Sequence, residues 1–170
     1  MKTKNVVYIA LYLAMFYVLD YITQLIPFLQ MPMGGSIGIS VIALLLASYH
    51  LGYRYGILTG LLSIFIQYLT GGVYVQHPMQ FLLEYPLAFG IYGLATLFPN
   101  VRLFKFKVYT GIIVTNIIRM LAHIIAGAVY WKTTWPASIS YNAPYMLMTL
   151  LVTLIVTPLI IDRIKISINK

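Results

Sequence analysis

Long apolar segments separated by short polar connections run through the whole chain of 170 residues. An α-helix needs about 20 mostly apolar residues to cross the ~30 Å hydrocarbon core of a bilayer. The connections, such as QMPMGGS, TGGVYVQHP and KTTWPASISYN, combine turn-forming residues with polar ones. We therefore predict an all-α integral membrane protein, a bundle of six transmembrane helices in a single membrane domain at residues 1–170. The predicted helices span residues 6–27, 37–51, 55–71, 80–98, 108–131 and 144–161.

The composition agrees with a chain that lies in lipid. Only 8% of the residues are charged and the mean hydropathy is +0.90, whereas a soluble domain carries about 25% charged residues. The first apolar run is longer than that of a signal peptide and lacks a small-residue cleavage pattern, so we interpret it as a retained first span. The chain has no cysteine, which excludes disulfides and cysteine-ligated metal sites.

The basic residues predict the orientation of this multi-pass chain. With an even number of spans both termini lie on one side, and that side would hold nine basic residues while the opposite loops hold only Lys132. The nine are Lys2, Lys4, Arg54, Arg102, Lys105, Lys107, Arg163, Lys165 and Lys170. The positive-inside rule then places both termini in the cytoplasm. The net charge of +8 follows from this topology, and no nucleic-acid partner is needed to explain it.

One acidic residue, Glu84, lies within the apolar run QHPMQFLLEYPLAFGIYGLA at residues 76–95. A carboxylate in hydrocarbon is costly and usually faces a partner or a cavity, so Glu84 is a candidate functional residue. Pro86 cannot donate a helical hydrogen bond, which predicts irregular backbone beside the acid. The alternative is a fixed ion pair between Glu84 and another helix.

The one cation predicted inside a span is Arg119. His123 follows four residues later and therefore shares a helix face with it, and Asn116 and Gly127 continue roughly the same stripe. This segment runs outward from the basic connection, so His123 would lie at a depth similar to Glu84. Two alternatives are open: an Arg119–Glu84 salt bridge with a hydrogen-bonded histidine, or a pocket in which Glu84 meets a cationic ligand.

Aromatic residues gather at the same depth. They are Tyr74, Tyr85, Trp131, Trp135, Tyr141 and Tyr145. Each alone is typical of the aromatic belt at a membrane interface, but together with a carboxylate they suit a planar, positively charged ring. Asn142 offers a donor and an acceptor for the edge of such a ring.

Small residues at four-residue spacing occur in two places. Ala10 and Ala14 lie in the first segment, and Gly52, Gly56 and Gly60 lie around the third. Such spacing allows close helix contact, either within the bundle or with a partner. The run MPMGGSIGIS lacks the order of a phosphate-binding loop, and we interpret it as a flexible lid.

The chain does not assemble the motif set of a membrane enzyme. HExxH is absent and the three histidines are far apart. The letters GGSIG at residues 34–38 fit GxSxG, but the chain offers only three acidic residues as candidates for a triad. We therefore predict no catalytic residues, no metal site and no cofactor.

Four runs of the sequence carry a family resemblance that extends over the whole chain: QHPMQFLLEYPLAF, RMLAHIIAGAVYW, MPMGGSIGIS and YNAPYM. With them the chain resembles the thiamine-specific S components of energy-coupling-factor (ECF) vitamin transporters. The resemblance implies a subunit of a bacterial plasma membrane that captures thiamine from outside and depends on a coupling transmembrane subunit and two cytoplasmic ATPases. It implies that Glu84 is the counter-charge for thiamine and that Tyr74, Tyr85 and Trp131 stack around its rings. The remaining implied contacts are Arg119, His123 and Asn142 with the ligand, and Ala10 and Ala14 with the coupling subunit.

Two departures from that family concern one wall of the implied site. Ala137 stands where relatives often carry a tyrosine, and Tyr141 is present instead, so Tyr141 is a further candidate contact. The connection between Trp131 and Asn142 is also shorter. The alternatives are therefore a thiamine precursor or another vitamin as ligand, or a structural membrane protein in which Glu84 and Arg119 only pair.

Overall fold

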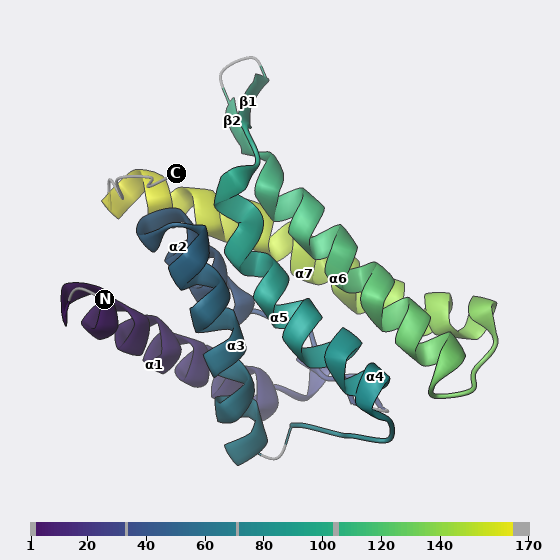
Figure 1. The fold of residues 1–170 in the computed structure, drawn as a ribbon. Helices are drawn as coiled ribbons and strands as arrows, with labels where there is room; N and C mark the ends of the chain where they lie inside the picture. The colour runs from purple at the N-terminus through teal and green to yellow at the C-terminus, as the bar shows by residue number, and fades with distance from the viewer. Residues whose placement is uncertain (1–2, 33, 71, 104–105, 165–170) are drawn as a thin grey trace.

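The computed structural model describes residues 3–32, 34–70, 72–103 and 106–164, and these are mostly helical. Helices α6 and α7 pack side by side in opposite directions, and a small antiparallel hairpin precedes α6 (Figure 1). The main elements are α1 (Thr3–Leu25), η1 (Pro27–Leu29), α2 (Val41–Leu51), α3 (Tyr53–Leu69), β1 (Asn100–Leu103), β2 (Phe106–Tyr109), α6 (Thr110–Val129) and α7 (Trp135–Ile164).

Between α3 and β1 lies one continuous helical segment whose winding changes along its length. It comprises α4 (Pro78–Leu82), the π-helical η2 (Leu83–Leu87), α5 (Ala88–Gly90) and the 3-10 helix η3 (Ile91–Leu97). Pro86 lies in the π-helical part, where its missing N–H removes one bond of a regular helix. The irregular backbone predicted beside Glu84 is confirmed, and the acid lies within the widened turn.

Within the described residues, three helices are long and apolar enough to cross a membrane: Thr3–Leu25, Thr110–Val129 and Trp135–Arg163. Their outer faces carry large exposed hydrophobic side chains, among them Leu11, Leu121 and Ile155. In lipid such side chains are well placed, whereas in water they would form an unusually large apolar surface.

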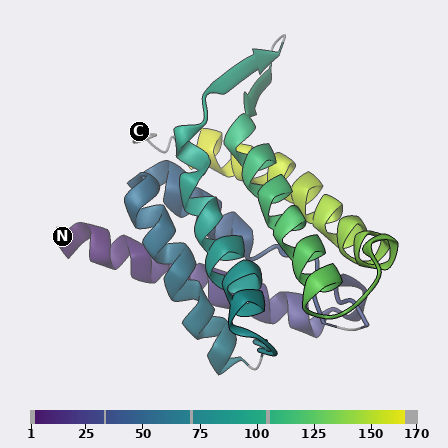
Figure 2. The same ribbon diagram turned by 45° about the vertical axis from the view of Figure 1, so that its right-hand side comes forward.

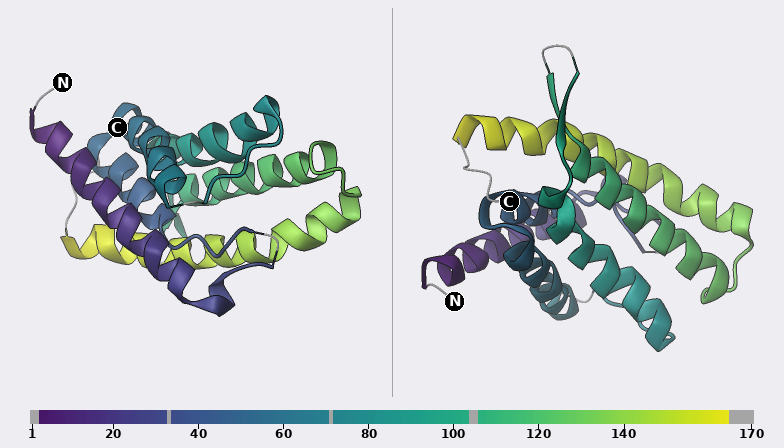
Figure 3. Two further views of the ribbon diagram at one scale, coloured as in Figure 1. Left: turned by 90° about the horizontal axis from the view of Figure 1, so that it is seen from below. Right: turned by 45° about the horizontal axis from the view of Figure 1, so that its top comes forward.

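Helix α2 forms the centre of the bundle. Every residue from Val41 to Tyr49 is buried, because α1, α3, η3 and α7 surround the helix (Figure 3). A helix that is apolar on all sides requires such a position.

Glycines allow the backbone of the 78–97 segment to touch its neighbours. A Cβ atom at Gly93 would overlap the backbone of Ile57, and one at Gly60 would overlap the carbonyl of Phe89. The glycines of α3 thus serve packing inside the bundle. Ala10 and Ala14, by contrast, are exposed on the outside of α1.

The basic connection PNVRLFKFK forms the β1–β2 hairpin, which pairs Asn100 with Tyr109 and projects from one end of the bundle (Figure 2). The Tyr109 hydroxyl donates a hydrogen bond to Asp162 Oδ1 of α7 (3.0 Å), and the His50 ring at the end of α2 packs against Tyr8 of α1. The basic residues described near these elements are Lys4, Arg54, Arg102, Lys107 and Arg163. The predicted members Lys2, Lys105, Lys165 and Lys170 lie outside the described residues.

Two predicted helix starts differ from the structure by four residues or more. The last helix begins at Trp135 rather than at 144, so most of KTTWPASISYN is helical and Asn142 lies inside α7. The Thr134 hydroxyl accepts from the Ala137 N–H (3.3 Å) and Pro136 fits the first turn, which together start the helix early. The second helix begins at Val41 rather than at 37, because residues before it form an extended strap.

Replacing Gly93 by alanine should lower the free energy of unfolding by about 1–3 kcal/mol, since the added methyl group forces α3 and η3 apart. The matched control is Gly90→Ala in the same segment, where the new Cβ would meet only the flexible Leu61 side chain at 3.5 Å. Thermal unfolding in detergent compares the two variants. Equal shifts in melting temperature would contradict the close packing described here.

Candidate functional site

Glu84 is the centre of a polar cluster that η2 forms with the C-terminal half of α6 and with Trp131, which follows α6. Its side chain is only 13% exposed. Its carboxylate accepts hydrogen bonds from the Trp131 indole N–H (3.0 Å) and from the Gln80 amide. The His123 Nδ1 atom lies 4.0 Å from Glu84 Oε1. Two neutral donors and one imidazole therefore surround the acid.

Arg119 does not pair with Glu84. Within the described residues, the only ion-pair contact within 4.0 Å joins His123 and Glu84. The Arg119 guanidinium lies over the Phe89 ring, 4.7 Å from its centroid, and donates to the Tyr92 hydroxyl (3.3 Å). The structure thus does not form the Arg119–Glu84 salt bridge that was one alternative, and the carboxylate has no fixed cationic side chain.

Two nitrogen atoms of the cluster are left without hydrogen-bond partners. They are Arg119 Nε and His123 Nε2, and both are buried. A buried polar atom without a partner costs about 1–3 kcal/mol, and such atoms call for an explanation, of which a bound ligand is one. Both residues come from one face of α6, as their spacing predicts.

On α7, Asn142 and Tyr145 complete the polar cluster. The Asn142 amide donates to the Ser138 carbonyl (2.9 Å), and its Oδ1 atom accepts from the Tyr145 hydroxyl (2.7 Å). Through this bond to Asn142, Tyr145 belongs to the cluster, although we did not include it among the predicted contacts. The signal was its position three residues after Asn142 on the same helix face.

Tyr74 and Tyr85 shape the connection before α4. The Tyr85 hydroxyl accepts from the Tyr74 N–H (2.8 Å), and the Tyr85 ring stacks on Phe81. The Tyr74 side chain is 61% exposed. That Tyr74, Tyr85 and Trp131 stack around the rings of a ligand stays a prediction.

Gln80 was missed by the sequence analysis. It is fully buried and donates to Glu84 and to the Tyr74 carbonyl (3.1 Å), while its Oε1 atom accepts from the Gln76 N–H (3.0 Å). It therefore fixes Glu84 relative to the preceding connection. The available signal was a polar residue four positions before the acid, on the same helix face.

The strap, residues 26–40 with Met33 outside the described set, crosses α7 beside this cluster (Figure 3). The Gly38 N–H donates to Thr149 Oγ1 (2.9 Å), and the Tyr141 hydroxyl donates to the Gly34 carbonyl. Gly34 and Gly35 have φ angles of +84° and +93°, which side-chain-bearing residues rarely adopt. Tyr141 thus contacts the predicted lid.

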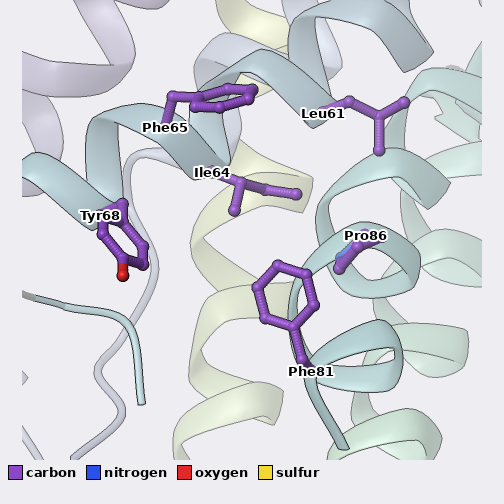
Figure 4. Close-up of a pocket in the computed structure, with 6 residues that line it drawn as sticks. All are labelled: Leu61, Ile64, Phe65, Tyr68, Phe81 and Pro86. Atoms are coloured by element: carbon purple, nitrogen blue, oxygen red, sulfur yellow. The ribbon is translucent and has the colours of Figure 1, made fainter. Parts of the chain in front are cut away.

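A separate cavity of about 450 Å³ lies between α3 and the 78–97 segment (Figure 4). It contains none of the predicted contact residues. Its walls are apolar or aromatic and are formed by Leu61, Ile64, Phe65, Tyr68, Phe81 and Pro86. The cluster around Glu84 is the better candidate for a polar or charged ligand.

Residues 6–168 match the sequence model of a family described as thiamine transporter protein (Thia_YuaJ). The chain belongs to the thiamine transporter protein family. A curated relative, the thiamine transporter ThiT of Bacillus subtilis (strain 168), is 34% identical over 156 residues, which cover 82% of this chain and 80% of the relative. The resemblance noted in the sequence is therefore confirmed at the level of the family. This is a family of transporters, in agreement with the prediction that the chain is not an enzyme.

A solved structure of ThiT from Listeria monocytogenes superposes with a TM-score of 0.66, covering 94% of this chain and 98% of that chain. At 19% identity this likeness concerns the fold alone. It confirms the coarse prediction of a mostly helical membrane protein.

Replacing Gln80 by alanine should lower the free energy of unfolding by about 1–2 kcal/mol, because Glu84 and the 74–76 backbone lose buried partners. The matched control is Gln76→Ala, since the Gln76 side chain is exposed and only its backbone N–H is bonded. Chemical or thermal unfolding in detergent measures both. If Gln76→Ala were as costly as Gln80→Ala, the anchoring role of Gln80 would be wrong.

Proposed function

We propose that this chain is the thiamine-binding membrane subunit of an ECF-type importer in a bacterial plasma membrane. Membership of the thiamine transporter family and the 34% identity to a thiamine transporter support this. The subunit would capture the vitamin from outside and hold it without covalent chemistry.

The proposed topology has six spans with both termini in the cytoplasm. The spans are α1, α2, α3, the 78–97 segment, α6 and α7. The α2–α3 turn, the hairpin and the end of α7 would all lie on the cytoplasmic side. Most of the basic residues belong to that side, which supports this orientation. The cluster around Glu84 then lies in the outer half of the bundle, within reach of the strap.

The observation that carries the proposal is the carboxylate without a fixed cation. Glu84 is buried among neutral donors, and Arg119 is turned toward Phe89 and Tyr92. An unpaired buried charge is expensive, and a cationic ligand would remove that cost. The thiazolium ring of thiamine carries a permanent positive charge, so it fits a site of this sign.

Each predicted contact has a proposed role. Glu84 is the counter-charge, and Trp131, Tyr74 and Tyr85 form aromatic walls once the ligand is present. Arg119, His123 and Asn142 are polar contacts, and the unpartnered Arg119 Nε and His123 Nε2 atoms support the first two. Tyr141 would act through the strap, with Tyr145 as an additional wall.

The proposed partners are a coupling transmembrane subunit and two cytoplasmic ATPases. The exposed alanines of α1, Ala10 and Ala14, favour α1 as the docking surface, because they leave a flat strip between the exposed side chains of Val7 and Tyr17. The side chains of Ala10 and Ala14 lie on the outside of the bundle and are exposed in the part of the chain that the structure describes.

Replacing Glu84 by glutamine should weaken thiamine binding about 100-fold or more, since truncating one partner of a buried charge pair costs about 2–5 kcal/mol. Fluorescence titration of the purified protein with thiamine measures this. The control is Asp162→Asn, which removes a carboxylate bonded to Tyr109 at the opposite end and should bind normally. Glu84 would be excluded as the counter-charge if Glu84→Gln bound thiamine normally. It would also be excluded if the variant were less stable but bound thiamine with unchanged affinity.

Thiamine should quench the fluorescence of Trp131 rather than that of Trp135, the only other tryptophan in the sequence, because the Trp131 indole bonds directly to Glu84. Most of the quenching should therefore persist in Trp135→Phe and vanish in Trp131→Phe. Calorimetry on the Trp131→Phe protein distinguishes a lost signal from lost binding. Quenching that depends on Trp135 alone would place the ligand elsewhere.

A further inference from the structure

Asp20 is an acidic residue of α1 to which the proposed function gives no role. The chain has three acidic residues; Glu84 belongs to the site, and Asp162 bonds Tyr109 at the end with the hairpin. Asp20 lies in the last third of α1 and is half-buried. A carboxylate at that depth in an apolar helix is costly unless its interactions serve a purpose.

Asp20 connects α1 directly to the last residue of the strap, and Gln24 of α1 connects to the first half of the strap. Its Oδ1 atom accepts from the Ser40 hydroxyl (3.3 Å), and its Oδ2 atom accepts from the Gln24 amide (2.9 Å). The Gln24 carbonyl in turn accepts from the Gln30 side chain. Ser40 is the last residue of the strap, and Gln30 lies in its first half, where it pairs with Ser36.

The strap held in this way covers the cluster. A Cβ atom at Gly38 would lie 3.2 Å from Arg119 Nη1, and one at Gly35 would lie 3.2 Å from the Tyr145 ring. Asp20 bonds Ser40 at the end of this strap. One carboxylate of α1 is therefore tied to the segment that lies against the buried cation.

We propose that Asp20 is a positioning residue that latches the strap over Arg119 and Tyr145, and so controls access to the site. The identity of the ligand behind the strap rests on the proposed function, but the latch itself does not. Hydrogen bonds to a carboxylate are stronger than bonds between neutral groups. An Asp20→Asn variant keeps the shape of the side chain and loses the charge that the Ser40 hydroxyl meets, so the strap opens more often.

The chain has no cysteine, so a single Ser36→Cys substitution gives a unique reporter on the half-buried strap. The test measures the rate at which a water-soluble maleimide labels this cysteine in ligand-free protein. Asp20→Asn should raise the labelling rate about 5-fold or more, as expected for loss of one charge-assisted bond. Ser40→Ala, which keeps the charge, should raise it by a smaller factor and gives the test a second variant. Asp162→Asn should leave the rate unchanged.

A purely structural role of Asp20 predicts a different pattern. The control reporter is Ala47→Cys in the fully buried centre of α2, which becomes accessible only if the bundle loosens. The latch is overturned if neither Asp20→Asn nor Ser40→Ala changes the labelling rate of the Ser36→Cys reporter. It is also overturned if these variants raise the labelling rates of the Ser36→Cys and Ala47→Cys reporters equally. Because these measurements need no ligand, they stand even if thiamine fails to bind. Added thiamine should slow labelling of Ser36→Cys in otherwise unchanged protein, and its failure to do so would count against the proposed function alone.

Discussion

The structure is organised around a carboxylate that pairs with no lysine or arginine among the described residues. Glu84 lies among apolar helices and accepts bonds from Gln80 and Trp131, while the nearest imidazole is 4.0 Å away. In such surroundings an unpaired charge is unfavourable, and the proposed function assigns the balancing charge to a cationic ligand. Arg119 would cancel this charge if it pointed toward Glu84, but Phe89 and Tyr92 hold it away. We infer that binding, rather than folding, supplies the missing positive charge.

Three features of the backbone maintain that arrangement. The π-helical turn at Pro86 widens the helix next to Glu84, and the glycine contacts between α3 and the 78–97 segment fix the helix in space. The strap covers the cluster from the side of α7 and is bonded there through Gly38 and Gly34. Each feature relies on proline or glycine, whose backbone properties differ from those of other residues. The irregular η2 turn and the strap thus complete a site whose other residues lie on the regular helices α6 and α7.

The sequence predicted much of this because the dominant signals are local. Apolar length predicted the membrane character, and the spacing of Arg119 and His123 correctly placed both on one face of α6. The start of α7 was missed because the polar run before Asn142 looks like a loop, although Thr134 and Pro136 begin a helix there. The direction of Arg119 could not be predicted either, since its choice between Glu84 and Tyr92 depends on how three separate segments pack. Gln80 and Asp20 escaped notice for the same reason, as their partners lie on connections whose path only the fold defines.

The central claim, that Glu84 awaits a positive charge, is tested most directly by calorimetry with two matched ligands. One is thiamine, and the other is an isostere of thiamine whose five-membered ring is uncharged. The account predicts that the native chain binds thiamine much more tightly than the neutral isostere, and that Glu84→Gln removes most of this preference. Equal affinity of the native chain for both ligands would contradict the claim, because Glu84 would then contribute nothing to the recognition of charge.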